Sequence, residues 1–391
     1  MNGPDTARAQ LSRRQTPVLL VGIVGLILWI VAGHGSQQFF RSYLVAFLFW
    51  AAIPLGCLGV LMLHHLTGGW WGYPIRRLLE AGSRTLRWTA VLFLPVLFGV
   101  PKLYSWTQPG GISNDWVNSF KAAYLQSGFF IARAVCYFAI WLALAYFLNK
   151  WSAEQDRTND PRLAARMSAL SGPGLILWGL TITAAAIDWV MSLEPHWFST
   201  IYGMIWMLIA VLAGLCLVIL VLRLLSDFEP LKDCVEPSRY IDLGNIMLTF
   251  VLLWTYLSFD QLLIIWAGNM KDEIPWYTHR VFGGWAPVAV ALIVLHFFVP
   301  FFLLLQRTMK RRLRALSAVA ALLFLVSFVD VYWLVAPSYD TSPHPHWLDL
   351  FAVIGVGGVW LAAFLSELKK WPLLPLHDPR FEGELVHEHG D

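Results

Sequence analysis

Ten apolar segments, separated by shorter polar stretches, follow one another along the chain. Each is close to the ~20 residues that an α-helix needs to cross a ~30 Å hydrocarbon core. The pattern therefore predicts an all-α polytopic membrane protein of about ten transmembrane helices. The segments cover residues 17–33, 39–64, 84–104, 123–149, 168–193, 198–225, 240–267, 281–306, 314–336 and 347–367.

The same pattern divides the chain into three parts. We expect 1–16 to form a polar N-terminal segment, 17–367 the membrane domain and 368–391 a polar C-terminal tail. Arg13 and Arg14 precede the first apolar segment, as basic residues do in a secretory signal. Because a second spanning segment follows at once and no A-x-A cleavage pattern appears, we expect the first segment to be retained as a helix.

Basic residues are distributed unevenly between the two sides of the predicted membrane domain. The side that holds both termini carries 22 Lys and Arg residues, whereas the opposite loops carry 5. Since cytoplasmic loops carry the excess of basic residues, we expect both termini in the cytoplasm. On that side, the stretch 72–81 (GYPIRRLLEA) is predicted to be a short interfacial helix with its basic face toward lipid headgroups.

Composition narrows the class of protein. Apolar residues make up 58% of the chain and charged residues 14%, against about 45–50% and about 25% in a soluble domain. The net charge of +3 gives no sign of a nucleic-acid partner. The four cysteines are scattered without CxxC or CxxCH spacing, and three of them, in apolar runs, are expected to be buried free thiols. We expect this chain to hold no metal ion, iron–sulfur cluster or haem.

Three aspartates interrupt the apolar segments at similar positions. Asp188, Asp260 and Asp330 lie in the fifth, seventh and ninth segments, before the end of each. A membrane-buried charge costs several kcal/mol unless it is paired or faces a cavity. One hypothesis is the outer half of a proton path or a polar pocket for a redox headgroup. The other is charge pairing that fixes helix packing, with Lys102 and Arg133 as the candidate cations.

Further ionisable residues extend the first hypothesis. Asp188 is the preferred proton acceptor, because Glu194 and His196 follow it toward the outer side. His296 lies near the middle of the eighth segment, where it is either a proton relay or a hydrogen-bonded packing residue. The predicted proton-path candidates are therefore Asp188, Asp260, Asp330, Glu194, His196 and His296.

Four stretches resemble a known family. They are 188–203 (DWVMSLEPHWFSTIYG), 259–285 (FDQLLIIWAGNMKDEIPWYTHRVFGGW), the earlier HHLTGGWWGYPIRRLLEA and the closing LHDPRFEGELVHEH. They are similar to the F-type membrane subunit of alternative complex III, a bacterial quinol-oxidising complex, and to NrfD/PsrC-type membrane anchors. The resemblance covers the chain from about residue 20 to its end.

The resemblance implies a fold, partners and a location. It implies two four-helix bundles, at about 39–193 and 198–336, with flanking helices, in the bacterial inner membrane. Implied partners are a paralogous quinol-binding membrane subunit, an iron–sulfur subunit, a multihaem c-type cytochrome and a terminal oxidase, besides membrane lipids. Iron–sulfur clusters and haem c belong to those partners, and quinone binds nearby. The implied role is structural support and proton translocation.

Two other functions stay open. A secondary transporter would show interrupted helices in both halves, and Pro54, Pro95 and Pro173 interrupt only the first. A purely structural scaffold would need no ionisable path at all. Because the inner halves of the helices hold few acids or histidines, the sequence favours an outer half-channel over a continuous proton path.

Overall fold

The computed structural model describes residues 4–110, 121–234, 236–375 and 377–378, and the predicted tail from residue 379 onward lies outside it. Every regular element in those ranges is helical. Within the described residues, nine helices are long and apolar enough to cross a membrane, and one bent pair of helices brings the number to as many as ten. The predicted all-α polytopic membrane fold is confirmed.

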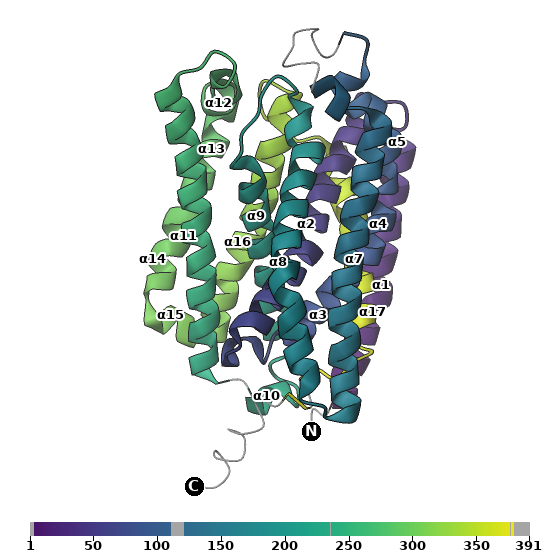
Figure 1. Ribbon diagram of the computed structural model, residues 1–391, viewed down its shortest axis with the longest axis vertical. Helices are drawn as coiled ribbons and strands as arrows, with labels where there is room; N and C mark the ends of the chain where they lie inside the picture. The colour runs from purple at the N-terminus through teal and green to yellow at the C-terminus, as the bar shows by residue number, and fades with distance from the viewer. Residues whose placement is uncertain (1–3, 111–120, 235, 376, 379–391) are drawn as a thin grey trace.

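The long helices match the predicted segments closely. They are α1 (Pro4–Gly33), α2 (Gln37–Thr67), α7 (Ser127–Thr158), α8 (Arg162–Trp189), α9 (Tyr202–Leu225), α11 (Pro237–Gly268), α16 (Leu313–Val335) and α17 (Trp347–Leu368). α1 begins at Pro4, so the segment 1–16, expected to be separate, is largely part of the first helix. The start of α1 and the end of α17 lie at what we call the N-terminal face, and the other end of the molecule is the opposite face (Figure 1).

Two predicted spans are broken rather than straight, one in each half of the chain, so the expectation that only the first half holds interrupted helices is wrong. The third consists of α3 (Arg76–Arg84) and α4 (Leu86–Leu92), followed after a bend of 49° by α5 (Leu94–Leu103). The eighth consists of α13 (Ala286–Leu292), the π-helical turn η5 (Ile293–Phe298) and α14 (Val299–Leu305). Pro300 lies just after that turn and has no N–H for the carbonyl four residues earlier, which accounts for the break.

Short helices connect the spans. On the N-terminal face these are η1 (Trp70–Gly72), α10 (Leu231–Cys234) and α15 (Arg307–Arg311). On the opposite face they are η2 (Ser105–Thr107), η3 (Met191–Leu193), α12 (Ile274–Val281), η4 (Gly283–Trp285) and η6 (Ala336–Ser338). α12 lies at the top of the molecule in Figure 1, and α15 lies near the bottom.

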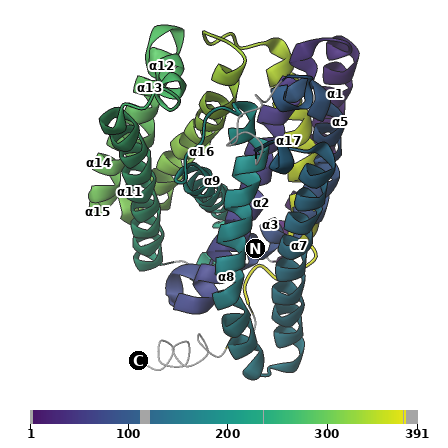
Figure 2. The ribbon, with the colours of Figure 1, turned by 45° about the horizontal axis from the view of Figure 1, so that its top comes forward.

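α2 is the central helix, and its most apolar stretch is entirely buried by the other helices. It packs closely on α9 through Gly56, where a Cβ atom would lie 1.8 Å from the carbonyl oxygen of Ala210. Small residues allow two membrane helices to approach in this way. In Figures 1 and 2, α11–α15 lie on one side of the central α2, α9 and α16, whereas α1, α4, α5, α7 and α17 lie on the other. The two predicted bundles therefore share one continuous core.

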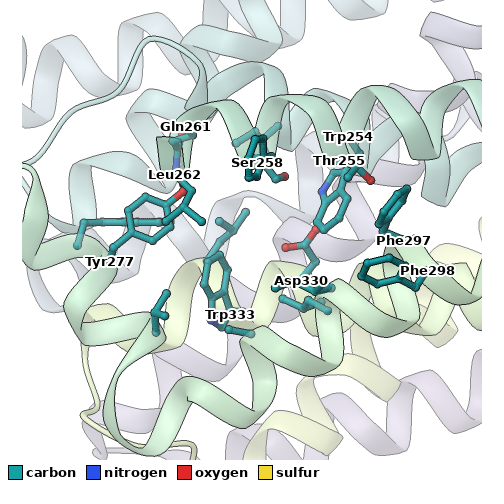
Figure 3. A pocket seen from close by; sticks show the side chains of 18 residues that line it. Trp254, Thr255, Ser258, Gln261, Leu262, Tyr277, Phe297, Phe298, Asp330 and Trp333 are labelled. Carbon is teal, nitrogen blue, oxygen red and sulfur yellow. Dashed lines mark hydrogen bonds between the residues drawn. The ribbon is translucent and has the colours of Figure 1, made fainter. Parts of the chain in front are cut away.

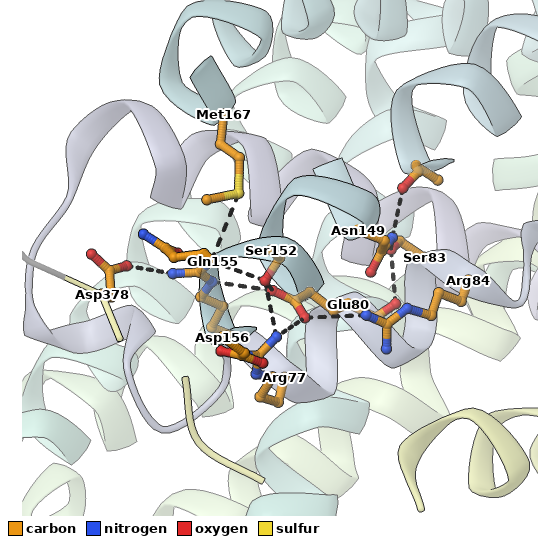
Figure 4. Close-up of polar contacts among 12 residues, drawn as sticks. Arg77, Glu80, Ser83, Arg84, Asn149, Ser152, Gln155, Asp156, Met167 and Asp378 are labelled. Carbon is orange, nitrogen blue, oxygen red and sulfur yellow. Dashed lines mark hydrogen bonds and ion pairs between the residues drawn. The ribbon is translucent and has the colours of Figure 1, made fainter. Parts of the chain in front are cut away.

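The prediction that 72–81 lies at the membrane interface is wrong, because the side chains of α3 are buried inside the protein. Arg76 and Arg77 are 0% and 2% exposed, and both pair with Glu80, at 3.1 and 2.7 Å. Arg77 also pairs with Asp156 of α7, as Figure 4 shows. The two arginines therefore join α3 to α7 inside the protein rather than to lipid headgroups.

Candidate functional site

The three membrane aspartates lie at comparable depths. Counted to the ends of their spans at Leu193, Gly268 and Ser338, they precede those ends by five, eight and eight residues. At 1.5 Å per residue this places them about 8–12 Å below the opposite face. Their surroundings, however, differ sharply from one aspartate to the next.

Asp188 is completely buried, and both oxygens of its carboxylate accept hydrogen bonds. Arg133 of α7 donates two hydrogen bonds to its carboxylate, at 2.8 and 2.9 Å, in a bidentate ion pair. The hydroxyl of Tyr137 donates a third, at 2.8 Å. The guanidinium also stacks on the ring of Tyr124, with the centroid 3.7 Å away. The sequence hypothesis that Arg133 pairs with an aspartate of this layer is confirmed, and the pair ties α7 to α8.

Asp330 is equally buried, at 1% exposed, but its environment is different. Its Oδ2 atom accepts no hydrogen bond from any described residue. The nearest cationic candidate is His296 of η5, whose Nδ1 lies 3.4 Å away, and neither nitrogen of that imidazole has a hydrogen-bond partner in the described chain. A buried polar group without a partner is costly, so this pair is suited to a ligand, water or proton.

A cavity of about 390 Å³ lies beside Asp330, between α11, α12, α13, η5 and α16. Figure 3 shows the carboxyl group of Asp330 directed toward Trp254 and Thr255. The cavity is lined by Ile205, Trp254, Thr255, Ser258, Phe259, Gln261, Leu262, Trp276, Tyr277, Val281, Ala289, Leu292, Ile293, Phe297, Phe298, Asp330, Trp333 and Leu334.

The cavity reaches the apolar outer surface of the molecule. Phe259 and Ile293, which line it, are 60% and 51% exposed. Such exposed apolar side chains on a membrane-spanning helix face lipid. The cavity is thus a mainly aromatic space, entered from the lipid side, with one carboxyl group in its wall.

Two indole groups add hydrogen-bond donors to this wall. The Nε1 atoms of Trp254 and Trp333 are buried and donate to no described residue. The ring of Trp254 stacks on His296, with centroids 3.8 Å apart, and this holds the imidazole beside the cavity. π-Helical turns like the one carrying His296 are frequent at functional sites.

Asp260 and Lys102 stay apart from both aspartate sites. Asp260 is partly exposed on α11 and has neither a hydrogen bond nor an ion pair within the described residues. Lys102 is exposed, with its ammonium group 5.4 Å from the centroid of Phe40. No described carboxylate pairs with it, so the charge pair considered for Lys102 is not formed.

Glu194 pairs with Arg280 of α12, which lies between two predicted spans. The guanidinium of Arg280, which is buried, donates to Glu194 at 2.7 Å and to the carbonyl of Leu334 at 3.2 Å. Ser338 donates to the same carboxylate oxygen at 2.8 Å. His196 is exposed and makes no contact with this group, so the predicted Glu194–His196 continuation is not assembled.

Sequence reasoning missed the aromatic part of the site. Trp254, Trp333 and Tyr277 are not among the predicted site residues, although Trp254 stands six positions before Asp260 and Trp333 three after Asp330. These spacings are consistent with a shared helix face only at Trp333. That α11 faces α16 across the cavity cannot be predicted from the sequence and is seen only in the tertiary structure.

Two tyrosines outside the spans have raised pKa values. Burial raises the pKa of Tyr277, in α12, to about 12, against the hydrogen bond from Gln261 and the charge of Arg280, which both lower it. Burial and the nearby Asp188 carboxylate raise the pKa of Tyr124 to about 12. The phenol of Tyr277 therefore stays protonated at neutral pH and faces the cavity as a hydroxyl group.

The cysteines differ in one respect from expectation. Cys57 and Cys216 are buried free thiols, as predicted, whereas Cys136 is exposed on α7. Within the described residues, no group of three or more His, Cys, Asp or Glu side chains is placed to hold a metal ion.

Comparison with known proteins adds no identification. No family model matches the chain, and no curated protein matches it.

Proposed function

We propose that this chain is a multi-pass membrane subunit of a quinol-oxidising respiratory complex. The four stretches that resemble the F-type subunit of alternative complex III support the assignment. The same resemblance supports a location in the bacterial inner membrane, and the distribution of Lys and Arg supports an orientation with both termini in the cytoplasm. Partner subunits with iron–sulfur clusters and haem c would hold the electron acceptors.

The observation that carries the proposal is the Asp330 cavity. A quinol is a lipid-soluble aromatic ring with two hydroxyl groups, so it needs an apolar entrance, aromatic walls and a few polar groups. The cavity provides these, with Phe259 and Ile293 at the lipid surface and Asp330 in the wall. Its volume of about 390 Å³ falls in the range of small-molecule sites.

The chemistry of quinol oxidation requires two proton acceptors. Oxidation of one quinol releases two protons and two electrons, and the electrons pass to a redox group of a partner subunit. Asp330, whose carboxyl group lines the cavity, accepts the protons and passes one to the imidazole of His296, whose Nδ1 lies 3.4 Å from Oδ2. We assign the indole N–H of Trp333, which donates to no described residue, as the donor to a ring oxygen.

Protons would leave toward the opposite face. Asp330 and Leu334 lie four residues apart on one side of α16, and Ser338 follows four residues later at the end of η6. The carbonyl of Leu334 and the hydroxyl of Ser338 both contact the Arg280–Glu194 pair, about 12 Å from Asp330 along the helix. That distance is too long for a direct transfer, so water must bridge it.

The test compares two Asp→Asn variants in the purified complex. Asp330→Asn should lower quinol oxidation at least about tenfold, as expected for loss of a proton acceptor. Asp260→Asn is the matched control, because Asp260 lies in the same layer and bundle but does not line the cavity. Turnover is measured with a short-chain quinol and an artificial electron acceptor, and subunit content is checked by gel electrophoresis.

Normal turnover of Asp330→Asn in a fully assembled complex would exclude the proposed proton acceptor and leave a scaffold role. Purification of the chain as a functional single-chain transporter, with no redox partners, would overturn the assignment to a respiratory complex.

A further inference from the structure

A second cavity lies far from Asp330, toward the N-terminal face. Its volume is about 1070 Å³, and it is bounded by α3, α4, α7 and the end of α17. It is lined by Ser83, Arg84, Arg87, Leu142, Ala145, Tyr146, Asn149, Lys150, Ala153, Glu154, Arg157, Thr158, Glu367, Lys370 and Trp371.

The lining carries an excess of positive charge. Five cations face two carboxylates, Glu154 and Glu367. Glu367 is shared by Arg87 and by Lys370, the latter at 2.6 Å. One carboxylate therefore serves two cations, and the excess of positive charge remains in the cavity.

Two of these cations have no counter-ion. Lys150 and Arg157 are exposed on α7, and neither forms an ion pair with any residue that the structure describes. They stand seven residues apart, which places them on the same helix face, about 10 Å from one another along the axis. Two anionic groups held about 10 Å apart would match this spacing.

A buried hydrogen-bond acceptor lies between the charged rim and the core. The amide nitrogen of Asn149 donates to the hydroxyl of Ser83 at 2.9 Å and to the carbonyl of Ala145 at 2.7 Å, and Figure 4 shows this residue near Arg84. The Oδ1 atom of Asn149 is buried and accepts no hydrogen bond within the described chain. It is free to accept one from a ligand hydroxyl.

Apolar side chains continue from the cavity along the outside of the molecule. Tyr146, in the lining, is 59% exposed, and Val135, three turns further along α7, is 62% exposed. On the neighbouring helix α4, Trp88 and Val91 are 44% and 54% exposed. An acyl chain lying between α4 and α7 would cover these surfaces.

We infer that this cavity binds the headgroup of diphosphatidylglycerol, a lipid with two phosphates joined by a glycerol that bears one hydroxyl group. One phosphate pairs with Lys150 and the other with Arg157, while the hydroxyl donates to Oδ1 of Asn149. Basic pockets between membrane helices bind anionic headgroups in this way. The inference is independent of the proposed quinol chemistry.

The experiment measures lipid binding to the purified full-length chain by native mass spectrometry. Lys150→Gln/Arg157→Gln should weaken diphosphatidylglycerol binding roughly thirtyfold, since each basic residue near the headgroup contributes about a factor of five. The matched control is Arg162→Gln/Arg166→Gln, which removes equal charge from the exposed start of α8, outside the cavity. It should bind the lipid like the unmodified chain.

Asn149→Ala gives a second measurement that does not depend on charge. It should weaken binding of diphosphatidylglycerol but leave binding of phosphatidic acid, which has no headgroup glycerol, unchanged. Equal loss in the two double variants would overturn the site, because it would indicate a general surface charge effect. Competition by inorganic phosphate at equal strength would overturn the lipid assignment and leave a simple anion site.

Discussion

Two buried aspartates at nearly the same depth have opposite environments. Asp188, in the first half of the chain, receives two hydrogen bonds from Arg133 and one from Tyr137. Asp330, in the second half, lies beside an aromatic cavity, and its Oδ2 accepts no hydrogen bond from the described residues. A carboxylate that is fully satisfied fixes helix packing, whereas one that is not satisfied can exchange protons or bind a ligand. The same residue type at the same height is structural in one half and a candidate acceptor in the other.

The largest effect is expected where the satisfied aspartate loses its cation. Arg133→Met leaves the Asp188 carboxylate buried without its cation, although the hydrogen bond from Tyr137 remains, and this should lower the free energy of unfolding by about 3 kcal/mol. The measurement is the midpoint of thermal unfolding in detergent, followed by tryptophan fluorescence.

The double variant Arg133→Met/Asp188→Asn serves as the control. It removes both charges and should recover much of the lost stability. If the single and double variants unfold at the same temperature, the ion pair is not the source of the effect.

A direct comparison of the two aspartates should give a smaller difference. Asp188→Asn weakens three charge-assisted hydrogen bonds and should destabilise the protein by about 2 kcal/mol. Asp330→Asn should change stability by less than about 0.5 kcal/mol, because Oδ2 of Asp330 receives no hydrogen bond from the described chain. Equal destabilisation of the two variants in the same unfolding assay would show that Asp188 and Asp330 do not differ in their contribution to stability.

The cavity wall offers a more delicate test. Trp333→Phe removes an N–H donor but keeps an aromatic ring. The KM for quinol should rise about fivefold with kcat unchanged, because the loss of one hydrogen bond to the quinol weakens its binding by about that factor. Trp360→Phe is the control, because Trp360 also has an unpaired indole nitrogen but is buried far along the chain in α17. A rise in KM in both variants would show that the effect is not specific to the cavity.

The smallest effect concerns alkaline pH. Burial raises the pKa of Tyr277 from 10.0 to about 12, so the folded protein keeps a proton that the unfolded chain has already released. The free energy of unfolding should therefore fall as the pH rises through this interval. When the thermal unfolding midpoint is measured between pH 10 and about pH 12, it should fall less steeply in Tyr277→Phe than in the unmodified chain. A fall as steep as that of the unmodified chain would exclude a contribution from Tyr277.

The sequence by itself determined the fold class and most helix positions. Apolar stretches of about 20 residues have few alternatives in lipid, since every backbone group must be bonded within its own helix. It also identified Asp188, Asp330 and His296 as exceptions, and Arg133 as a pairing candidate, because charge in an apolar segment is visible without a structure.

Only the tertiary structure decided which of these ionisable side chains contact one another. Hydropathy cannot tell whether a basic helix faces lipid or protein, so 72–81 was placed at the interface although Arg76 and Arg77 are buried with Glu80. The rotation of each helix and the contacts of its neighbours determine whether a carboxylate meets a guanidinium or a cavity. Those contacts join residues far apart in sequence, such as Arg133 with Asp188 and His296 with Asp330, and local pattern carries no information about them.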